Sequence, residues 1–268
     1  MATGGADVAL TGLGISQGIG IDINTTGGTT GDPRNDSNGG GTITLTGHDG
    51  LAAGAILLAG GVSTLSDSTA AITLRGTTDL QLPSIIAANG TLVLGDNTAI
   101  IGLISGKITQ ATSTALDINA LQVGTATNAV GGSVVLANNT NKIGALTGLY
   151  SGSNTDLQYD LDIYDASGGL NITDAVISAE GLRIRTTDTT TGVLSIGANS
   201  ILASGDIYLS GLSVTQSAGS TINADNTGVG GTGGSIRIDG GGNANNITLE
   251  GIVTTDNASA TAIEIVNA

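Results

Sequence analysis

Few side chains in this sequence could carry chemistry. The only histidine is His48, which stands beside Asp49 in the segment GHDG. A hydrolytic relay needs such a histidine next to a nucleophile and a carboxylate. His48 follows an alternating apolar segment and precedes Gly50, a residue typical of turns. We expect His48 to be an exposed turn residue without a catalytic role.

The densest group of carboxylates is the stretch from Asp156 to Asp165, with the sequence DLQYDLDIYD. An extended strand places alternate side chains on opposite faces, which separates the acids from the apolar residues: Asp156, Asp160 and Asp162 on one face, Leu157, Tyr159, Leu161 and Ile163 on the other. Ca²⁺ takes six to eight oxygen ligands, so neighbouring segments or waters would have to complete a calcium site here. We expect a solvated strand face.

Other signatures of chemistry are missing. Polysaccharide lyases with a β-helical fold combine carboxylates, calcium and a basic residue in a groove, but no Lys or Arg occurs between Lys142 and Arg183. The glycine-rich runs do not match the phosphate-binding loop GxxxxGK[ST], and the calcium-binding nonapeptide GGxGxDxUx is absent. We therefore predict no catalytic residues, no metal site and no cofactor.

Threonines cluster in two places, and a flat threonine ladder is one way in which solenoids bind ice. The clusters do not repeat regularly, so we expect ordinary solvent-facing strand residues. They are Thr42, Thr44 and Thr46, and then Thr186, Thr187 and Thr189 to Thr191.

The charge balance argues against two classes of partner. The chain has 22 Asp and Glu against 7 Lys and Arg, a formal net charge of −15. Such a surface repels phosphate backbones instead of releasing their counterions, so we expect neither a nucleic acid nor an anionic membrane as partner. The longest apolar run, Leu51 to Val62, contains several glycines and is shorter than the roughly 18 residues of a membrane-spanning helix. We expect no membrane span.

The composition predicts a folded chain with an unusual core. There is no Cys, Trp or Phe, and four tyrosines provide all the aromatic side chains. A chain with 45 glycines could be disordered, but 39% of its residues are hydrophobic and its mean hydropathy is +0.27. Disorder goes with low hydrophobicity, so we expect a fold built around small aliphatic residues.

A short alternating apolar unit, usually closed by glycine, returns along the chain and predicts half-buried strands. It occurs as GTITLTG at 41–47, AAITLRG at 70–76, GDIYLSG at 205–211, GSIRIDG at 234–240 and NNITLEG at 245–251. Shorter units are LDI at 116–118, SVVL at 133–136, GLRI at 181–184 and VLSI at 193–196. The side chains expected to point inward are Ile43, Leu45, Ile72, Leu74, Ile207, Leu209, Ile236 and Ile238.

The spacing of these units predicts a solenoid. Ile184, Ile207, Ile236 and Ile263 follow one another at intervals of 23, 29 and 27 residues, and such periods are typical of repeat architectures. Three short strands and three turns per repeat make one coil of a parallel β-helix. Stacked aliphatic residues would form its interior, which explains the absence of large aromatic residues. We predict an all-β fold of about 10 to 12 coils over 1–268, with no helical domain and with glycine-rich turns at the corners.

The stretch from Gly205 to Gly242 resembles the repeats of filamentous-haemagglutinin-like exoproteins, which Gram-negative bacteria secrete by the two-partner route. The most characteristic piece is GSTINADNTGVGGTGGSIRI at 219–238. The resemblance is good over 192–268 and looser upstream, and autotransporter passengers share much of the composition. It implies a right-handed parallel β-helix used as a surface adhesin, biofilm scaffold or stalk, located outside the cell or on its surface.

These observations favour a structural or adhesive segment without catalysis, whose partners are host-surface or matrix glycans or proteins. The N-terminal residues lack the basic and apolar regions of a signal peptide, and the family's secretion domain is not recognisable. We therefore expect a fragment of a larger exoprotein, able to associate end to end through its apolar final strand at 262–266. Two alternatives stay open: a self-assembling filament or sheath subunit, and a carbohydrate-active β-helix enzyme.

Overall fold

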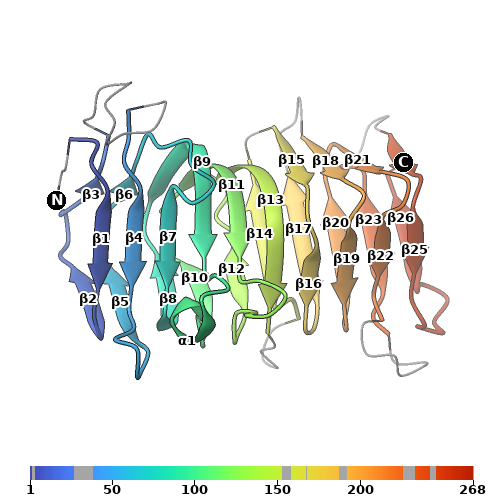
Figure 1. Ribbon diagram of the computed structural model, residues 1–268. Helices are drawn as coiled ribbons and strands as arrows, with labels where there is room; N and C mark the ends of the chain where they lie inside the picture. The colour runs from blue at the N-terminus through green and yellow to red at the C-terminus, as the bar shows by residue number, and fades with distance from the viewer. Residues whose placement is uncertain are drawn as a thin grey trace. The chain divides into compact units, whose positions relative to one another are not determined.

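A computed structural model describes residues 1, 4–26, 39–152, 158–166, 168–186, 192–225, 233–241 and 246–267. The chain divides into two compact units, Met1–Gly131 and Gly132–Ala268, and each is a parallel β-helix (Figure 1). The only helix among the described residues is the single turn α1 (Ala99–Gly102). The prediction of an all-β solenoid without a helical domain is confirmed. A single repeat region over 1–268 stays a prediction.

Unit 1 builds each coil from three faces. The strands of the first sheet are β1 (Val8–Thr11), β4 (Ile43–Thr46), β7 (Ile72–Arg75) and the second halves of β9 (Ile85–Leu94) and β11 (Leu116–Val123). The second sheet contains β2 (Gly14–Gln17), β5 (Gly54–Leu58), β8 (Thr77–Leu82) and β10 (Ile108–Gln110). The third face is formed by β3 (Ile23–Asn24), β6 (Val62–Ser63) and the first halves of β9 and β11.

Unit 2 also builds each coil from three faces. Its first sheet contains β13 (Lys142–Ser151), β15 (Gly169–Ile172), β18 (Val193–Ile196), β21 (Ser213–Gln216) and β24 (Ile247–Leu249). The second sheet contains β12 (Val134–Leu136), β14 (Leu161–Asp165), β17 (Leu182–Thr186), β20 (Ile207–Ser210), β23 (Ile236–Asp239) and β26 (Ile263–Val266). The third face is formed by the end of β13 with β16 (Val176–Ser178), β19 (Ser200–Ala203), β22 (Thr221–Asn223) and β25 (Ile252–Thr254).

The third strand changes its place in the coil between the two units. In unit 1 it follows the strand of the second sheet, whereas in unit 2 it follows the strand of the first sheet. Strand β13 shows how the chain turns this corner: Leu146 pairs in the first sheet, and Leu149 pairs on the third face. Gly148 lies between them with φ +113°, a value that favours glycine. The described residues supply four strands of the second sheet in unit 1 and six in unit 2, which agrees with the predicted number of about 10 to 12 coils.

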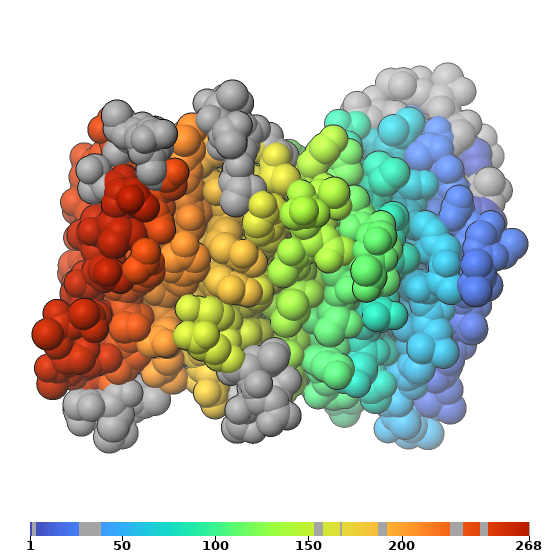
Figure 2. Space-filling view, turned by 180° about the vertical axis from the view of Figure 1, so that it is seen from behind, coloured from blue at the N-terminus to red at the C-terminus, as the bar shows by residue number. Residues whose placement is uncertain are grey.

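Aliphatic ladders fill the interior of both units. In unit 1, Val8, Ile43, Ile72, Leu92 and Leu121 are paired from coil to coil, and none of them is more than 2% exposed. Burying each such side chain contributes about 1.5 to 3 kcal/mol. All eight residues predicted to point inward are buried, which confirms the alternation. Figure 2 shows the coils of each unit as successive bands of colour on the surface.

Unit 2 has an equivalent ladder of Leu161, Leu182, Ile207, Ile236 and Ile263. The register corrects one sequence-based expectation, because Ile207 pairs with Leu182, and Ile184 pairs with Leu209. The expected 23-residue interval from Ile184 to Ile207 is therefore two residues too short. A shift of two residues keeps the same side chains inside, so apolar alternation could not reveal it.

Glycine is the first residue of several of the repeated units, because the backbones of neighbouring coils approach closely there. A Cβ atom on Gly234 would lie only 2.1 Å from the backbone carbonyl carbon of Gly205 in the preceding coil. Both glycines stand two residues before their strands, which begin at Ile236 and Ile207. The long glycine-rich stretches predicted to form corners, 27–41 and 228–234, lie largely outside the described residues, as does most of 240–246.

Polar side chains close the corners and join the coils. Three glutamines at strand ends donate from Nε2 to the carbonyl oxygen four residues ahead: Gln17 to Ile21, Gln110 to Thr114 and Gln216 to Ser220. Six aspartates accept the backbone N–H of a neighbouring coil at 2.6 to 2.9 Å: Asp7 from Thr42, Asp22 from Gly61, Asp79 from Lys107, Asp165 from Ile143, Asp206 from Ser235 and Asp256 from Gly233. Many of the acidic residues thus stabilise coil stacking.

Truncation of the stacked residues tests this architecture. Ile207→Ala and Ile236→Ala should each lower the free energy of unfolding by about 2 to 5 kcal/mol, because each removes a buried side chain and leaves a cavity. Thr248→Ala, at an exposed position of β24, should change it by less than about 0.5 kcal/mol. Urea denaturation measures all three, and equal losses would contradict inward stacking.

Candidate functional site

His48 is buried, not exposed as its neighbours in the sequence suggested. The residue is 2% exposed, and its Nδ1 accepts a hydrogen bond from the backbone N–H of Gly50 at 2.8 Å. It also forms an antiparallel bridge with Ala53, which closes the loop between them. A Cβ atom on Gly76 in the next coil would lie 2.8 Å from the His48 Cβ. His48 is therefore a packed residue at the base of a loop.

The acidic stretch is also not a solvated face. Asp160 is 0% exposed and Asp162 is 5% exposed, while Asp156 and Leu157 lie outside the described residues. Leu161 and Ile163 point inward as predicted. The threonine prediction is wrong for Thr46 and Thr186, which are buried. Thr42 and Thr44 are partly exposed, and 187–191 lie outside the described residues.

Two arginines of the adjacent coil account for the burial of Asp162. Arg183 donates from Nε at 3.0 Å and from Nη2 at 2.5 Å, a bidentate arrangement, and Arg185 donates from Nη2 at 3.1 Å. Such charge-assisted hydrogen bonds offset the free energy needed to remove a carboxylate from water. The hydrogen bond with Asp162 also raises the pKa of Arg183. Arg183 and Arg185 lie far from Asp162 in the sequence, so the sequence patterns did not identify them as its partners. Pairing of β17 with β14 brings them beside it.

Tyrosines surround this cluster. The guanidinium of Arg183 lies 5.0 Å from the ring centre of Tyr159, and that of Arg185 lies 5.0 Å from the ring centre of Tyr164. Both distances are within the range of a cation–π interaction. Burial, together with the negative charge of Asp206, raises the pKa of Tyr159. A tyrosine hydroxyl is protonated at neutral pH even at its ordinary pKa of about 10, so that of Tyr159 can donate a hydrogen bond there.

Parallel pairing arranges these side chains in columns across the outer face of the second sheet of unit 2. The first column is Asp162, Arg183, Tyr208, Arg237 and Glu264. The second column is Tyr164, Arg185, Ser210, Asp239 and Val266. We call these two columns, together with Gln158, Tyr159 and Asp206, the arginine–tyrosine face.

The face has further polar contacts and one hollow. Arg237 pairs with Glu264 at 2.5 Å and with Asp239 at 3.6 Å, and the Tyr208 hydroxyl lies 3.5 Å from an Asp239 carboxylate oxygen. A shallow depression of about 240 Å³ is lined by Val135, Gln158, Tyr159, Asp162 and Arg183. Hydroxyl, amide and guanidinium groups and an aromatic ring meet there.

Comparisons of the chain with family models, curated proteins and solved structures give no match. Function is therefore inferred from the described residues. Among these, no group of three or more His, Cys, Asp or Glu side chains could hold a metal ion. No helix in the described part of the chain is long and apolar enough to cross a membrane.

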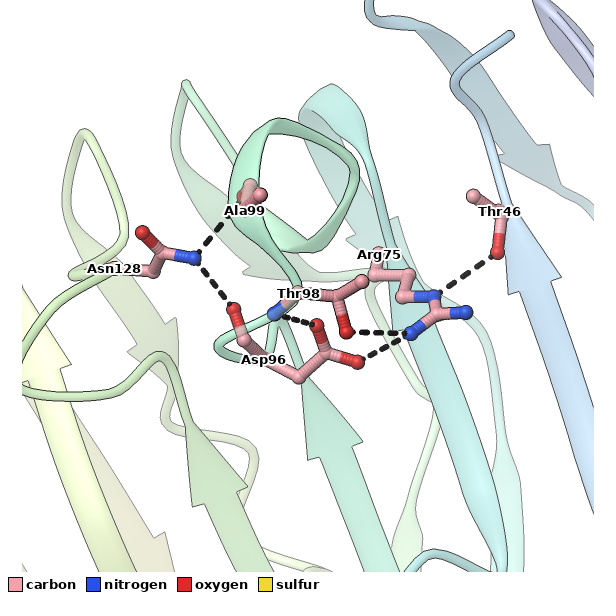
Figure 3. Close-up of polar contacts among 6 residues, drawn as sticks. All are labelled: Thr46, Arg75, Asp96, Thr98, Ala99 and Asn128. Atoms are coloured by element: carbon pink, nitrogen blue, oxygen red, sulfur yellow. Dashed lines mark hydrogen bonds and ion pairs between the residues drawn. The ribbon is translucent and has the colours of Figure 1, made fainter. Parts of the chain in front are cut away.

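Unit 1 contains a second polar cluster, which joins successive coils (Figure 3). Arg75 donates from Nη1 to Asp96 at 2.5 Å and to the Thr98 hydroxyl at 3.2 Å, and from Nε to the Thr46 hydroxyl at 3.1 Å. Asn128 donates from Nδ2 to the backbone carbonyl of Asp96 at 2.9 Å and to that of Ala99 in α1 at 3.1 Å. We call these residues the Arg75 clamp, because they connect four consecutive coils.

Unit 1 also has a hollow of about 720 Å³ on the outside of its second sheet, lined by Ser16, Gln17, Ile56, Leu57, Leu58, Ala59, Asp79, Leu80, Gln81, Lys107 and Thr109. Leu57 is 61% exposed there. The Asp79 carboxylate accepts the backbone N–H of Lys107 at 2.9 Å. Neither His48 nor an aromatic side chain lines this hollow.

Removing the buried carboxylate of Asp162 should destabilise the protein more than removing the exposed carboxylate of Glu264 on the same face. Asp162→Ala leaves two partly buried arginines without their shared acceptor, which should lower the free energy of unfolding by about 2 kcal/mol. Glu264→Ala removes a pair whose two side chains are each 44% exposed, so the loss should stay below about 1 kcal/mol. Urea denaturation at neutral pH measures both, and equal effects would show that burial of Asp162 contributes nothing.

The Arg75 clamp should make stability depend on pH. Burial opposes ionisation of Asp96, but hydrogen bonds from Thr98 and Arg75 outweigh it and hold the pKa below its ordinary value of 3.8. A lowered folded-state pKa contributes stability above the ordinary value, and this contribution disappears as the pH falls through the folded-state pKa. The stability advantage of the parent over Asp96→Asn should therefore shrink below about pH 4. A difference that stays constant down to the acid limit of folding would contradict this role.

Proposed function

We propose that this chain is a structural and adhesive β-helical segment of a large bacterial exoprotein of the filamentous-haemagglutinin-like type. It acts outside the cell or on the cell surface and has no catalytic role. The family assignment rests on the resemblance of 205–242, and the coiled architecture of each unit supports it. The segment presents outward side chains on a stiff, stacked backbone.

The main observation in support of this proposal is that the polar side chains contact groups of the protein itself. Six aspartates accept backbone N–H groups of neighbouring coils. Asp162 and Asp96 pair with arginines of adjacent coils, and His48 is buried in a loop. An enzyme needs a nucleophile or a base aimed at substrate, whereas these groups are directed at the protein itself.

A product assay separates this role from that of a carbohydrate-active enzyme. The protein is incubated with acidic polysaccharides such as polygalacturonate, and the absorbance of unsaturated products is followed. We expect no product above a buffer control, because Asp162, Arg183 and Arg185 are engaged with one another. Turnover that disappears in Asp162→Ala or in a variant of the unit 1 hollow, Lys107→Ala, would overturn the proposal.

A filament or sheath subunit is the second candidate, and the last coil of unit 2 favours it. Ile263 and Ile265 of β26 are 44% and 47% exposed, although Ile236 and Ile238, which pair with them in the preceding coil, are buried. An edge strand with exposed apolar residues can pair with another chain. A second copy could place its own coil on β26 and cover these residues.

Light scattering tests this end-to-end contact. The apparent mass of the parent should rise with protein and salt concentration, since salt screens the repulsion caused by the −15 charge. The double variant Ile263→Lys, Ile265→Pro should stay monomeric, because it adds charge and removes a backbone donor.

Leu51→Lys provides the matched control, because Leu51 is 91% exposed but lies in a loop between β4 and β5. This variant should associate like the parent. A parent that stays monomeric at high salt, indistinguishable from the double variant, would exclude the filament candidate.

A further inference from the structure

The arginine–tyrosine face concentrates the aromatic residues of the protein. Three of its four tyrosines, Tyr159, Tyr164 and Tyr208, lie there, in a chain without Phe or Trp. The remaining tyrosine, Tyr150, belongs to β13 and pairs with Ile177 on the third face of unit 2. Tyr159 and Tyr164 contact Arg183 and Arg185 of the next coil, and Tyr208 stands between Arg183 and Arg237 in the first column.

We propose that the arginine–tyrosine face binds a neutral polysaccharide strand that lies across the coils of unit 2. This inference deepens the adhesive part of the proposed function by naming a ligand class. The rings of Tyr159 and Tyr208 provide apolar surface for the C–H faces of sugar rings. The paired arginines and acids, with Gln158, provide donors and acceptors for the hydroxyl groups.

The charges of the face favour a neutral ligand over an anionic one. Arg183 and Arg185 share Asp162, and Arg237 pairs with Asp239 and Glu264. A polyanion would have to displace these carboxylates, and the −15 charge of the chain would repel it. A hydroxyl-rich neutral ligand can bond to paired charged groups without separating them.

The geometry fits a chain-like ligand. The column from Asp162 to Glu264 crosses five strands, which at the usual strand spacing is about 19 Å, long enough for several sugar rings in a row. The depression beside Gln158 and Tyr159 lies at one end of this column. Its volume of about 240 Å³ suits a single sugar ring.

The test uses the intrinsic tyrosine fluorescence of the whole protein, which has no tryptophan to mask it. The probes are cellohexaose and chitohexaose, two neutral β-linked oligosaccharides, and hexagalacturonate as the anionic counterpart. We expect a saturable fluorescence change with at least one neutral hexamer, little affected by salt. The corresponding disaccharide should bind about tenfold more weakly, because it covers fewer of the side chains in the column.

Matched variants locate the site. Tyr208→Thr removes the ring but keeps a residue suited to a strand, and it should weaken binding about tenfold, the loss expected for one stacking contact. Tyr208→Phe keeps the ring and should bind within about threefold of the parent, because only a hydroxyl is lost. Tyr150→Thr changes the tyrosine outside the face and should bind like the parent. Circular dichroism and urea denaturation verify that each variant is folded.

Three results would overturn the inference: no response to either neutral hexamer, a salt-sensitive response to hexagalacturonate alone, or equal weakening by Tyr150→Thr and Tyr208→Thr. If Tyr208→Thr does not fold, binding of the hexamers to the parent and to Tyr208→Phe still tests the inference. Failure of binding would not affect the structural role, because core truncation and light scattering test that separately.

Discussion

Stacking of one coil on the next is the constraint on which the other features depend. Parallel strands about 4.8 Å apart place each inward side chain directly on its counterpart in the neighbouring coil. Small aliphatic residues fill such an interior, as in the ladder from Val8 to Leu121. The same spacing brings backbones together before the strands, where Gly234 meets Gly205. The missing Phe and Trp and the abundance of glycine follow from one geometry.

Stacking also applies to the outward side chains, where it creates an electrostatic problem for an acidic chain. Like charges in adjacent coils would repel at strand spacing. Arg183 and Arg185 therefore both meet Asp162, and Arg237 meets Glu264. Several other aspartates sit at corners and accept backbone N–H groups. Four arginines, Arg75, Arg183, Arg185 and Arg237, thus form ion pairs with acids of adjacent coils.

Sequence patterns predicted the fold well because inward alternation is local: the pairs Ile43 with Leu45 and Ile236 with Ile238 can be recognised within seven residues. They did not predict the environment of polar residues, because that depends on the adjacent coil. His48 resembled an exposed turn residue, yet it packs against Gly76. Asp162 seemed to lack a base, yet Arg183 follows it by one coil and lies beside it. A search for opposite charges separated by one repeat could have found this pair.

Contacts between outward residues help to select the register of neighbouring strands. That register in turn determines which side chains lie next to one another on the arginine–tyrosine face. Inward alternation excludes a slip of one residue but tolerates a slip of two, as the expected 23-residue interval from Ile184 to Ile207 illustrates. A slip of two between β23 and β26 would move Glu264 from Arg237 to Asp239 or Ser235, and a slip between β20 and β23 would place a side chain where Gly234 approaches Gly205. The ion pairs and glycine contacts therefore select one register among those that the apolar core allows. The same register aligns Arg183, Tyr208 and Arg237 in one column, so the surface chemistry of this face is fixed by the way the coils stack.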